Sequence, residues 1–85
     1  MIFCYLLRCN DGSYYCGITD NLERRLRQHN IDKGKKYLRG KKLPVELVYF
    51  EKFRSRVNAH RRELEIKKLS PDKKRELSEN FRYSF

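Results

Sequence analysis

The sequence predicts a small α/β domain of the α+β type, in which a three-stranded, mainly antiparallel sheet is packed with helices. Three observations favour this class. Two short apolar runs flank a tight turn signal, a third apolar run begins near residue 45, and helix-start signals precede the segments between and after them. The 85 residues can form one modest hydrophobic core, so we expect a single domain over residues 1–85.

The first half of the chain predicts a hairpin followed by a helix. Residues 2–8 are almost continuously apolar and lead into Asn10-Asp11-Gly12, a strong turn signal, after which residues 13–18 return as a second strand. Thr19-Asp20-Asn21 supplies N-cap candidates for a helix that begins near Asp20 and ends at residue 29 or 30.

The second half predicts one strand and two helices. Residues 45–53 are typical of a third strand, and Ser55 or Asn58 caps a helix that runs to Leu69. Ser70-Pro71 combines an N-cap with proline at the first helical position, and it opens a final short helix.

The chain is strongly basic. Its 21 lysines and arginines outnumber 11 acidic residues, which gives a formal charge of +10. This charge attracts polyanions, with nucleic acid as the first candidate partner and an anionic membrane surface as the second. No apolar run approaches the roughly 20 residues that span a bilayer, and the first residues lack the basic region and cleavage site of a secretion signal. We therefore expect a cytoplasmic protein with no membrane-spanning segment.

Cysteine usage argues against a disulfide framework. Cys4, Cys9 and Cys16 are odd in number, and no paired C-x-x-C arrangement indicates a zinc site. We expect all of them to be reduced packing residues.

The first predicted helix carries basic residues on its inward side. Leu22 and Leu26 mark that side, and Arg25 and His29 follow Leu22 by three and seven residues, so they share it. A guanidinium in a poorly hydrated place is costly unless it has a partner. Arg24 and Arg27 point elsewhere and are expected to be solvated.

The second predicted helix carries an acid on its inward side. Glu63 lies four residues after Ala59 and three before Ile66, the residues that define the apolar face. Glu63 and Arg25 could pair as a structural salt bridge without any catalytic role. His60 and Glu65 lie off this face, and we expect neither to contribute.

These residues, in this order and spacing, resemble the GIY-YIG nuclease family. Phe3-Cys4-Tyr5 stands at the family's Gly-Ile-Tyr, and Tyr15-Cys16-Gly17 stands at its Tyr-Ile-Gly on the next strand. Arg25 and His29 follow at the family's helix spacing, and Glu63 falls at its metal-binding glutamate. The resemblance covers residue 2 to about residue 75. The chain is most similar to the small stand-alone branch of the family, and that branch is similar to the nuclease domain of endonucleases that cut branched DNA.

The resemblance implies specific roles in phosphodiester hydrolysis. Tyr5 would be the general base, with a lowered pKa or a hydrogen bond through Tyr15 to let it act near neutral pH. Arg25 would hold the non-bridging phosphate oxygens, and His29 would support Tyr5 or orient the attacking water. Glu63 would be the single protein carboxylate on Mg²⁺ or Mn²⁺.

The same residues also have purely structural interpretations. Tyr5 alone is typical of a core aromatic, and His29 of a satisfied interior histidine. Tyr14 and Tyr15 are strand neighbours that face opposite ways, so only one reaches a site, and the family match favours Tyr15. Gly17 permits close approach of the helix to the strand, or of a phosphate to the backbone.

A basic segment between the two halves is the predicted nucleic-acid contact. Its positive charge beside tyrosines suits phosphate binding with aromatic stacking, although a solvated charged loop has the same composition. The candidate contact residues are Lys33, Lys35, Lys36, Tyr37, Arg39, Lys41 and Lys42.

The function that these features favour is a metal-dependent endonuclease acting on DNA, with RNA still open as a substrate. Two alternatives remain. One is a catalytically inactive nucleic-acid-binding module, which would show salt-sensitive binding without Mg²⁺-dependent cleavage. The other is a nuclease subunit that needs a protein partner, for which residues 81–85 offer a candidate docking segment.

Overall fold

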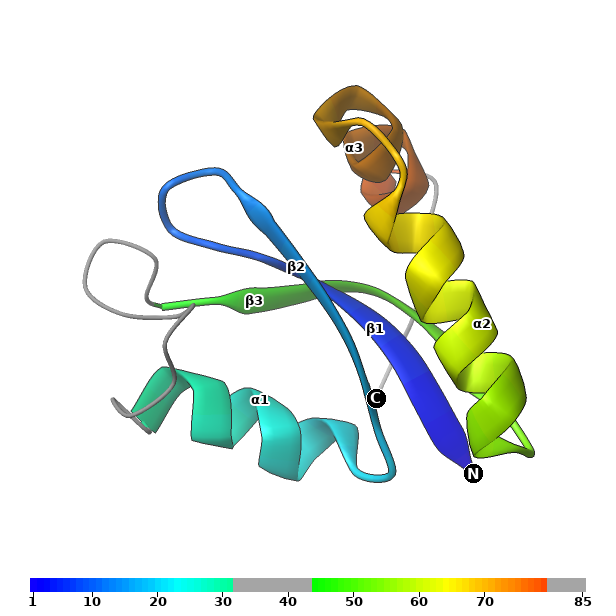
Figure 1. Cartoon of the computed structure of the whole chain (residues 1–85). Helices are drawn as coiled ribbons and strands as arrows, with labels where there is room; N and C mark the ends of the chain where they lie inside the picture. Colours follow the sequence, from blue (N-terminus) through cyan, green and yellow to red (C-terminus); the bar gives the residue numbers. More distant parts are fainter. Residues whose placement is uncertain (32–43, 80–85) are drawn as a thin grey trace.

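The computed structural model describes residues 1–31 and 44–79. Within these ranges the chain forms, in order, strands β1 (Ile2–Arg8) and β2 (Tyr14–Thr19), helix α1 (Leu22–Ile31), strand β3 (Glu46–Phe53), and helices α2 (Arg56–Lys67) and α3 (Pro71–Glu79) (Figure 1). The predicted α+β fold class and the order of its elements are confirmed. The basic segment 33–42 and the end segment 81–85 lie outside the described residues.

The described strands form an antiparallel sheet in the order β2-β1-β3. On the central strand, Tyr5 lies opposite Gly17 of β2 and Phe50 of β3. A register shift between Leu6 and Leu7 inserts one extra residue into β3. This bulge lets the neighbours Val48 and Tyr49 pack against the same buried cluster, which regular alternation of side chains would prevent.

The β1–β2 turn forms at the predicted place. Gly12 has a φ of +88°, a left-handed conformation that favours glycine, and its N–H donates to the Cys9 carbonyl at 2.9 Å. The Asp11 carboxylate accepts bonds from the Ser13 N–H at 3.0 Å and the Ser13 hydroxyl at 2.6 Å. Local side-chain chemistry therefore closes the hairpin.

Helix boundaries follow side-chain caps. The Asn21 side chain accepts a bond from the Arg24 N–H at 2.9 Å, so α1 begins at Leu22, two residues later than predicted. Ser55, rather than Asn58, caps α2. Ser70 caps α3 as predicted, accepting a bond from the Lys73 N–H at 3.2 Å.

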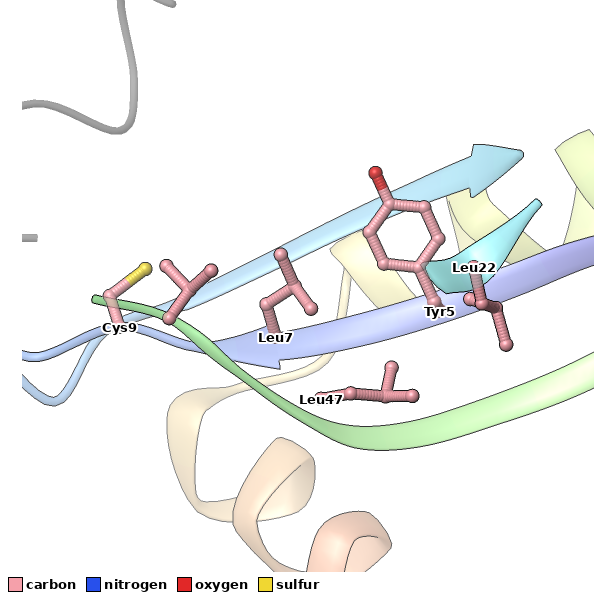
Figure 2. Packing of buried hydrophobic residues seen from close by; sticks show 6 residues of the cluster. Tyr5, Leu7, Cys9, Leu22 and Leu47 are labelled. Atoms are coloured by element: carbon pink, nitrogen blue, oxygen red, sulfur yellow. The ribbon is translucent and has the colours of Figure 1, made fainter. Parts of the chain in front are cut away.

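The sheet carries a buried cluster on each face, and Figure 1 shows α1 on one side of it and α2 on the other. The α1-side cluster, drawn as sticks in Figure 2, consists of Tyr5, Leu7, Cys9, Leu22, Val45 and Leu47. The α2-side cluster consists of Cys4, Leu6, Cys16 and Ile66. Because β1 is buried on both faces, its sequence is apolar without alternation.

The three cysteines are free and buried, as expected. Cys4 and Cys16 face each other in the α2-side cluster with their sulfur atoms 4.0 Å apart. The contact with Cys16, together with burial, raises the pKa of the Cys4 thiol. These thiols therefore pack as small apolar groups.

Candidate active site

The site centres on a hydrogen bond between β1 and α1. The Tyr5 hydroxyl lies 3.0 Å from Nε2 of His29. Both residues are almost fully buried, with 2 % and 1 % of their surface exposed. Leu22 anchors the first turn of α1 in the same cluster, and this packing holds His29, in the last turn of that helix, over Tyr5.

Tyr15 completes an aromatic group with these two residues. Its ring centroid lies 5.2 Å from that of His29 in an edge-on arrangement and 6.4 Å from that of Tyr5. Tyr14 packs instead against the cluster on the opposite face. The structure thus brings Tyr15, which is the tyrosine that the family match favoured, and not Tyr14, to Tyr5.

Gly17 makes room for the Tyr5 ring. A Cβ atom added to Gly17 would lie 2.6 Å from the Tyr5 hydroxyl oxygen and 2.8 Å from its Cζ atom. The sequence suggested that this glycine admits a helix or a phosphate, but its close neighbour is the side chain of its own cross-strand partner. The glycine therefore sets where the phenol lies.

The surroundings of Tyr5 make its phenol harder to ionise. Burial is the largest cause of a raised Tyr5 pKa, the negative charges of ionised Tyr15 and of Glu63 act in the same direction, and the Arg25 guanidinium lowers it in part. Of the two conditions under which Tyr5 could act near neutral pH, a lowered pKa and a hydrogen bond, the lowered pKa is not met. The hydroxyl's partner in this structure is His29, which the resemblance suggested as a support for Tyr5, rather than Tyr15.

Arg25 is the half-buried cation of this face. Among the residues that the structure describes, no group forms a hydrogen bond or ion pair with its guanidinium, and the positive charge of that group lowers the pKa of Tyr5. Arg24 behaves differently: it is exposed and pairs with Asp20 at 3.0 Å. The alternative of an Arg25–Glu63 salt bridge is not found, because the Glu63 carboxylate pairs with His60 and Lys67 instead.

Glu63 is held by its own helix. It is 9 % exposed, Oε1 lies 3.0 Å from His60 Nδ1, and Oε2 lies 3.2 Å from Lys67 Nζ. His60, for which the sequence predicts no role, contacts that carboxylate from three residues earlier on the helix, although most of its side chain is exposed. The three-residue spacing was the signal that the sequence interpretation missed.

The two halves of the candidate site come from opposite faces of the sheet. Tyr5, Tyr15 and Arg25 belong to the α1 side, whereas the buried side of α2, which carries Glu63, packs on the other face (Figure 1). Groups from two faces can meet only around an edge, and β2 is an edge strand of the described sheet.

The donor set around Glu63 fits a hard cation that keeps most of its water. No group of three or more His, Cys, Asp or Glu side chains within the described ranges could hold a metal ion. Mg²⁺ bound through one carboxylate, with water and phosphate oxygens as the remaining ligands, needs no such group. The buried Glu63 carboxylate would supply that one ligand.

A family comparison matches these motifs as a unit. The family model described as the GIY-YIG catalytic domain matches residues 1–76, and the chain therefore belongs to the GIY-YIG nuclease family. Nucleases of this family are generally metal-dependent and act on nucleic acid.

Within that family the chain is similar to small stand-alone UPF0213 proteins. It is 47 % identical to one from Haloquadratum walsbyi, over 91 % of this chain and 85 % of that one, and 48 % identical to one from Clostridium perfringens, over 91 % and 82 %. The solution NMR structure of a UPF0213 protein from Bacillus halodurans is 42 % identical with a TM-score of 0.57, covering 93 % of this chain and 84 % of that chain.

None of the helices within 1–31 and 44–79 combines the length and hydrophobicity that crossing a bilayer requires.

Proposed function

We propose that this protein is a structure-specific endonuclease of DNA repair or recombination that hydrolyses DNA phosphodiester bonds with Mg²⁺ or Mn²⁺. The observation that carries this proposal is the half-buried Arg25 guanidinium, which has no partner in the described part of the chain and acts on a hydrogen-bonded tyrosine–histidine pair. The packing of a hydrophobic core requires neither feature, whereas hydrolysis of a phosphodiester requires a cation that binds the phosphate and a group that accepts a proton.

Arg25 is the proposed phosphate ligand. A partly desolvated guanidinium gains most from an anion that accepts two parallel hydrogen bonds, and two non-bridging phosphate oxygens match that geometry. Bound there, Arg25 would stabilise the charge that develops as the phosphorus is attacked.

Tyr5 and His29 form the proposed proton path. Because burial raises the Tyr5 pKa, the phenol works as a relay rather than as a standing phenolate. Tyr5 takes a proton from the attacking water while its own hydroxyl proton passes to His29 Nε2, 3.0 Å away. The hydroxide oxygen bonds to phosphorus, the bond to the leaving sugar oxygen breaks, and that oxygen takes a proton from solvent.

Glu63 is the proposed metal ligand. The cation that it holds would supply positive charge to the phosphate and to the leaving oxygen. Lys67 binds the second carboxylate oxygen at 3.2 Å and fixes its orientation. A phosphate at the β2 edge would lie between Arg25 and Glu63, next to Tyr15 on the same strand.

The basic segment 33–42 is the proposed binding surface for the nucleic-acid backbone away from the scissile phosphate. Its positive charges would bind backbone phosphates without reading sequence, and its tyrosine would stack on an unpaired base. The residues assigned to this role are Lys33, Lys35, Lys36, Tyr37, Arg39, Lys41 and Lys42.

The deciding experiment is cleavage of a panel of flaps, junctions, single strands and duplexes, in DNA and RNA, with Mn²⁺, Mg²⁺ or chelator. We expect metal-dependent cleavage of branched DNA, abolished by Glu63→Gln with binding almost unchanged. Glu65→Gln is the matched control, because Glu65 lies on the same helix but is exposed and pairs with Arg62. Cleavage that survives Glu63→Gln would remove this carboxylate from the mechanism.

The burial and raised pKa of Tyr5 favour a second candidate, a nucleic-acid-binding module without catalysis. This candidate predicts salt-sensitive binding of the same panel with no product under any metal condition. A nuclease subunit would instead show no cleavage when tested alone, and it would cleave the same substrates once cell extract supplies its partner.

A further inference from the structure

His60 and Glu63 present two metal-ligating atoms side by side. They lie three residues apart on α2, so their side chains share one side of the helix. Nδ1 of His60 lies 3.0 Å from Oε1 of Glu63. The His60 side chain is 58 % exposed and that of Glu63 is 11 % exposed, so one ligand is open to solvent and the other is fixed in the core.

We propose that His60 and Glu63 together form the metal site, with the imidazole as a second protein ligand for a first-row transition ion such as Mn²⁺. This inference rests on the proposed function and deepens it. Two ligand atoms that bind one octahedral ion at about 2.1 Å and at right angles lie about 3.0 Å apart. The separation of these two atoms therefore matches that of two ligands of one ion, and a rotation of the exposed imidazole would direct both atoms at it.

The surroundings of the pair suit this role. Lys67 binds Oε2, the carboxylate oxygen that does not face His60, at 3.2 Å and so leaves Oε1 directed at the imidazole. The exposed ring gives an ion a path from solvent to the buried carboxylate. Water and a substrate phosphate would fill the remaining positions, which is why two protein ligands suffice.

The ligand types determine the metal preference. An imidazole nitrogen binds transition ions well, whereas Mg²⁺ prefers oxygen ligands. The pair therefore favours Mn²⁺ over Mg²⁺, and Co²⁺ and Ni²⁺ should bind more tightly still. A carboxylate acting alone would show a much smaller difference between Mn²⁺ and Mg²⁺.

A simple hydrogen bond between the same atoms makes the opposite prediction. If His60 only donates a bond to Glu63, a metal ion must displace that bond, and removing the imidazole leaves metal affinity unchanged or higher. If His60 is a ligand, its removal weakens Mn²⁺ binding. The sign of the change separates the two roles without any measurement of cleavage.

The test is Mn²⁺ binding by the full chain without nucleic acid, followed by the loss of the free-ion electron paramagnetic resonance signal, with Mg²⁺ measured by calorimetry. His60→Gln should weaken Mn²⁺ binding by about tenfold or more and Mg²⁺ binding by less than about twofold. Pulsed resonance should detect nitrogen coupling to Mn²⁺ in the unmodified protein and lose it in His60→Gln. Arg61→Gln, an exposed neighbour on α2, is the matched control and should change neither ion.

Unchanged or tighter Mn²⁺ binding in His60→Gln, or the absence of nitrogen coupling, would overturn the inference. Binding that still depends on Glu63 would then leave the proposed function intact with a single carboxylate ligand. Failure of the proposed function has its own readout, because it is the absence of any product from the substrate panel under every metal condition.

Discussion

The Tyr5 ring occupies the space that a side chain at position 17 would need, with its hydroxyl oxygen 2.6 Å from where the Cβ would lie. Gly17→Ala should therefore destabilise the fold by about 1–3 kcal/mol, as overpacking of a core does, and displace the phenol from His29. Urea denaturation measures the loss. In a double-mutant cycle, Tyr5→Ala should abolish most of the penalty of Gly17→Ala, whereas two additive penalties would show that the contact is not its cause.

Gly12 offers a contrasting case, because its requirement is conformational and not steric. A Cβ at Gly12 would meet no atom within 4 Å, but the φ of +88° is unfavourable for other residues. We expect Gly12→Ala to cost about 1–2 kcal/mol and Gly12→Asn distinctly less, since asparagine tolerates left-handed backbone best. Equal costs for the two substitutions, measured by the same denaturation, would contradict this explanation.

Arg25→Ala should slow cleavage about 100- to 1000-fold, the loss expected for a preorganised transition-state donor. Arg25→Lys should recover only part of that rate, because an ammonium cannot bind two oxygens in parallel. Arg27→Ala removes the same charge from an exposed site on α1 and should leave the rate almost unchanged. Single-turnover cleavage measures the rates of all three variants. Equal losses for Arg25→Ala and Arg27→Ala would show that Arg25 acts through the net charge of the protein and does not bind the phosphate directly.

Stability should fall at alkaline pH because folding suppresses tyrosine ionisation. Burial raises the pKa of Tyr5 above its ordinary value, and burial with a bond to Glu51 raises that of Tyr49 to about 12. Above about pH 10 the unfolded chain loses these protons while the folded chain keeps them, so the contribution is complete below pH 10 and lost as pH rises.

Urea midpoints at pH 9 and pH 11 test this effect. Tyr5→Phe should show a smaller decline between the two values than the unmodified protein, whatever its stability at pH 9. Lysine deprotonation acts on both proteins alike and cancels in the comparison. Parallel declines would indicate that Tyr5 does not carry the effect.

The basic segment should set the salt dependence of nucleic-acid binding. Replacing Lys35, Lys36, Lys41 and Lys42 by glutamine should reduce the slope of log affinity against log salt by about 0.9 for each lost duplex phosphate contact. The control replaces Lys68, Lys73, Lys74 and Arg75 around α3, which removes the same net charge. Fluorescence anisotropy at several salt concentrations measures both slopes, and equal changes would mean that net charge, not this segment, governs binding.

Much of the fold could be predicted because its signals are local. The turn at Asn10-Asp11-Gly12 and the cap at Ser70 use side chains that bond to backbone a few residues away. Errors were confined to boundaries, where neighbouring caps compete. At the start of α1, the Asn21 side chain provides the cap, so the helix begins at Leu22 rather than near Asp20.

Less of the candidate site could be predicted, because its contacts join separate segments. Tyr5 and His29 are 24 residues apart in sequence, and no local pattern states that they share a hydrogen bond. The missed His60–Glu63 contact had the opposite cause. It is local, but it was dismissed because His60 lies off the apolar face, although a side chain at the edge of that face can still reach inward.

The sequence alone determined much of what faces the core, since the helical period places Arg25 and Glu63 inward whatever their partners are, and strand alternation puts Tyr14 and Tyr15 on opposite faces. Only the tertiary structure decided what those residues meet. Strand pairing places Tyr5 over Gly17, α1 delivers His29 to the phenol, and α2 carries Glu63 to the other face of the sheet. The reason is that periodicity is a property of each segment, whereas register and helix packing result from burying all the segments together.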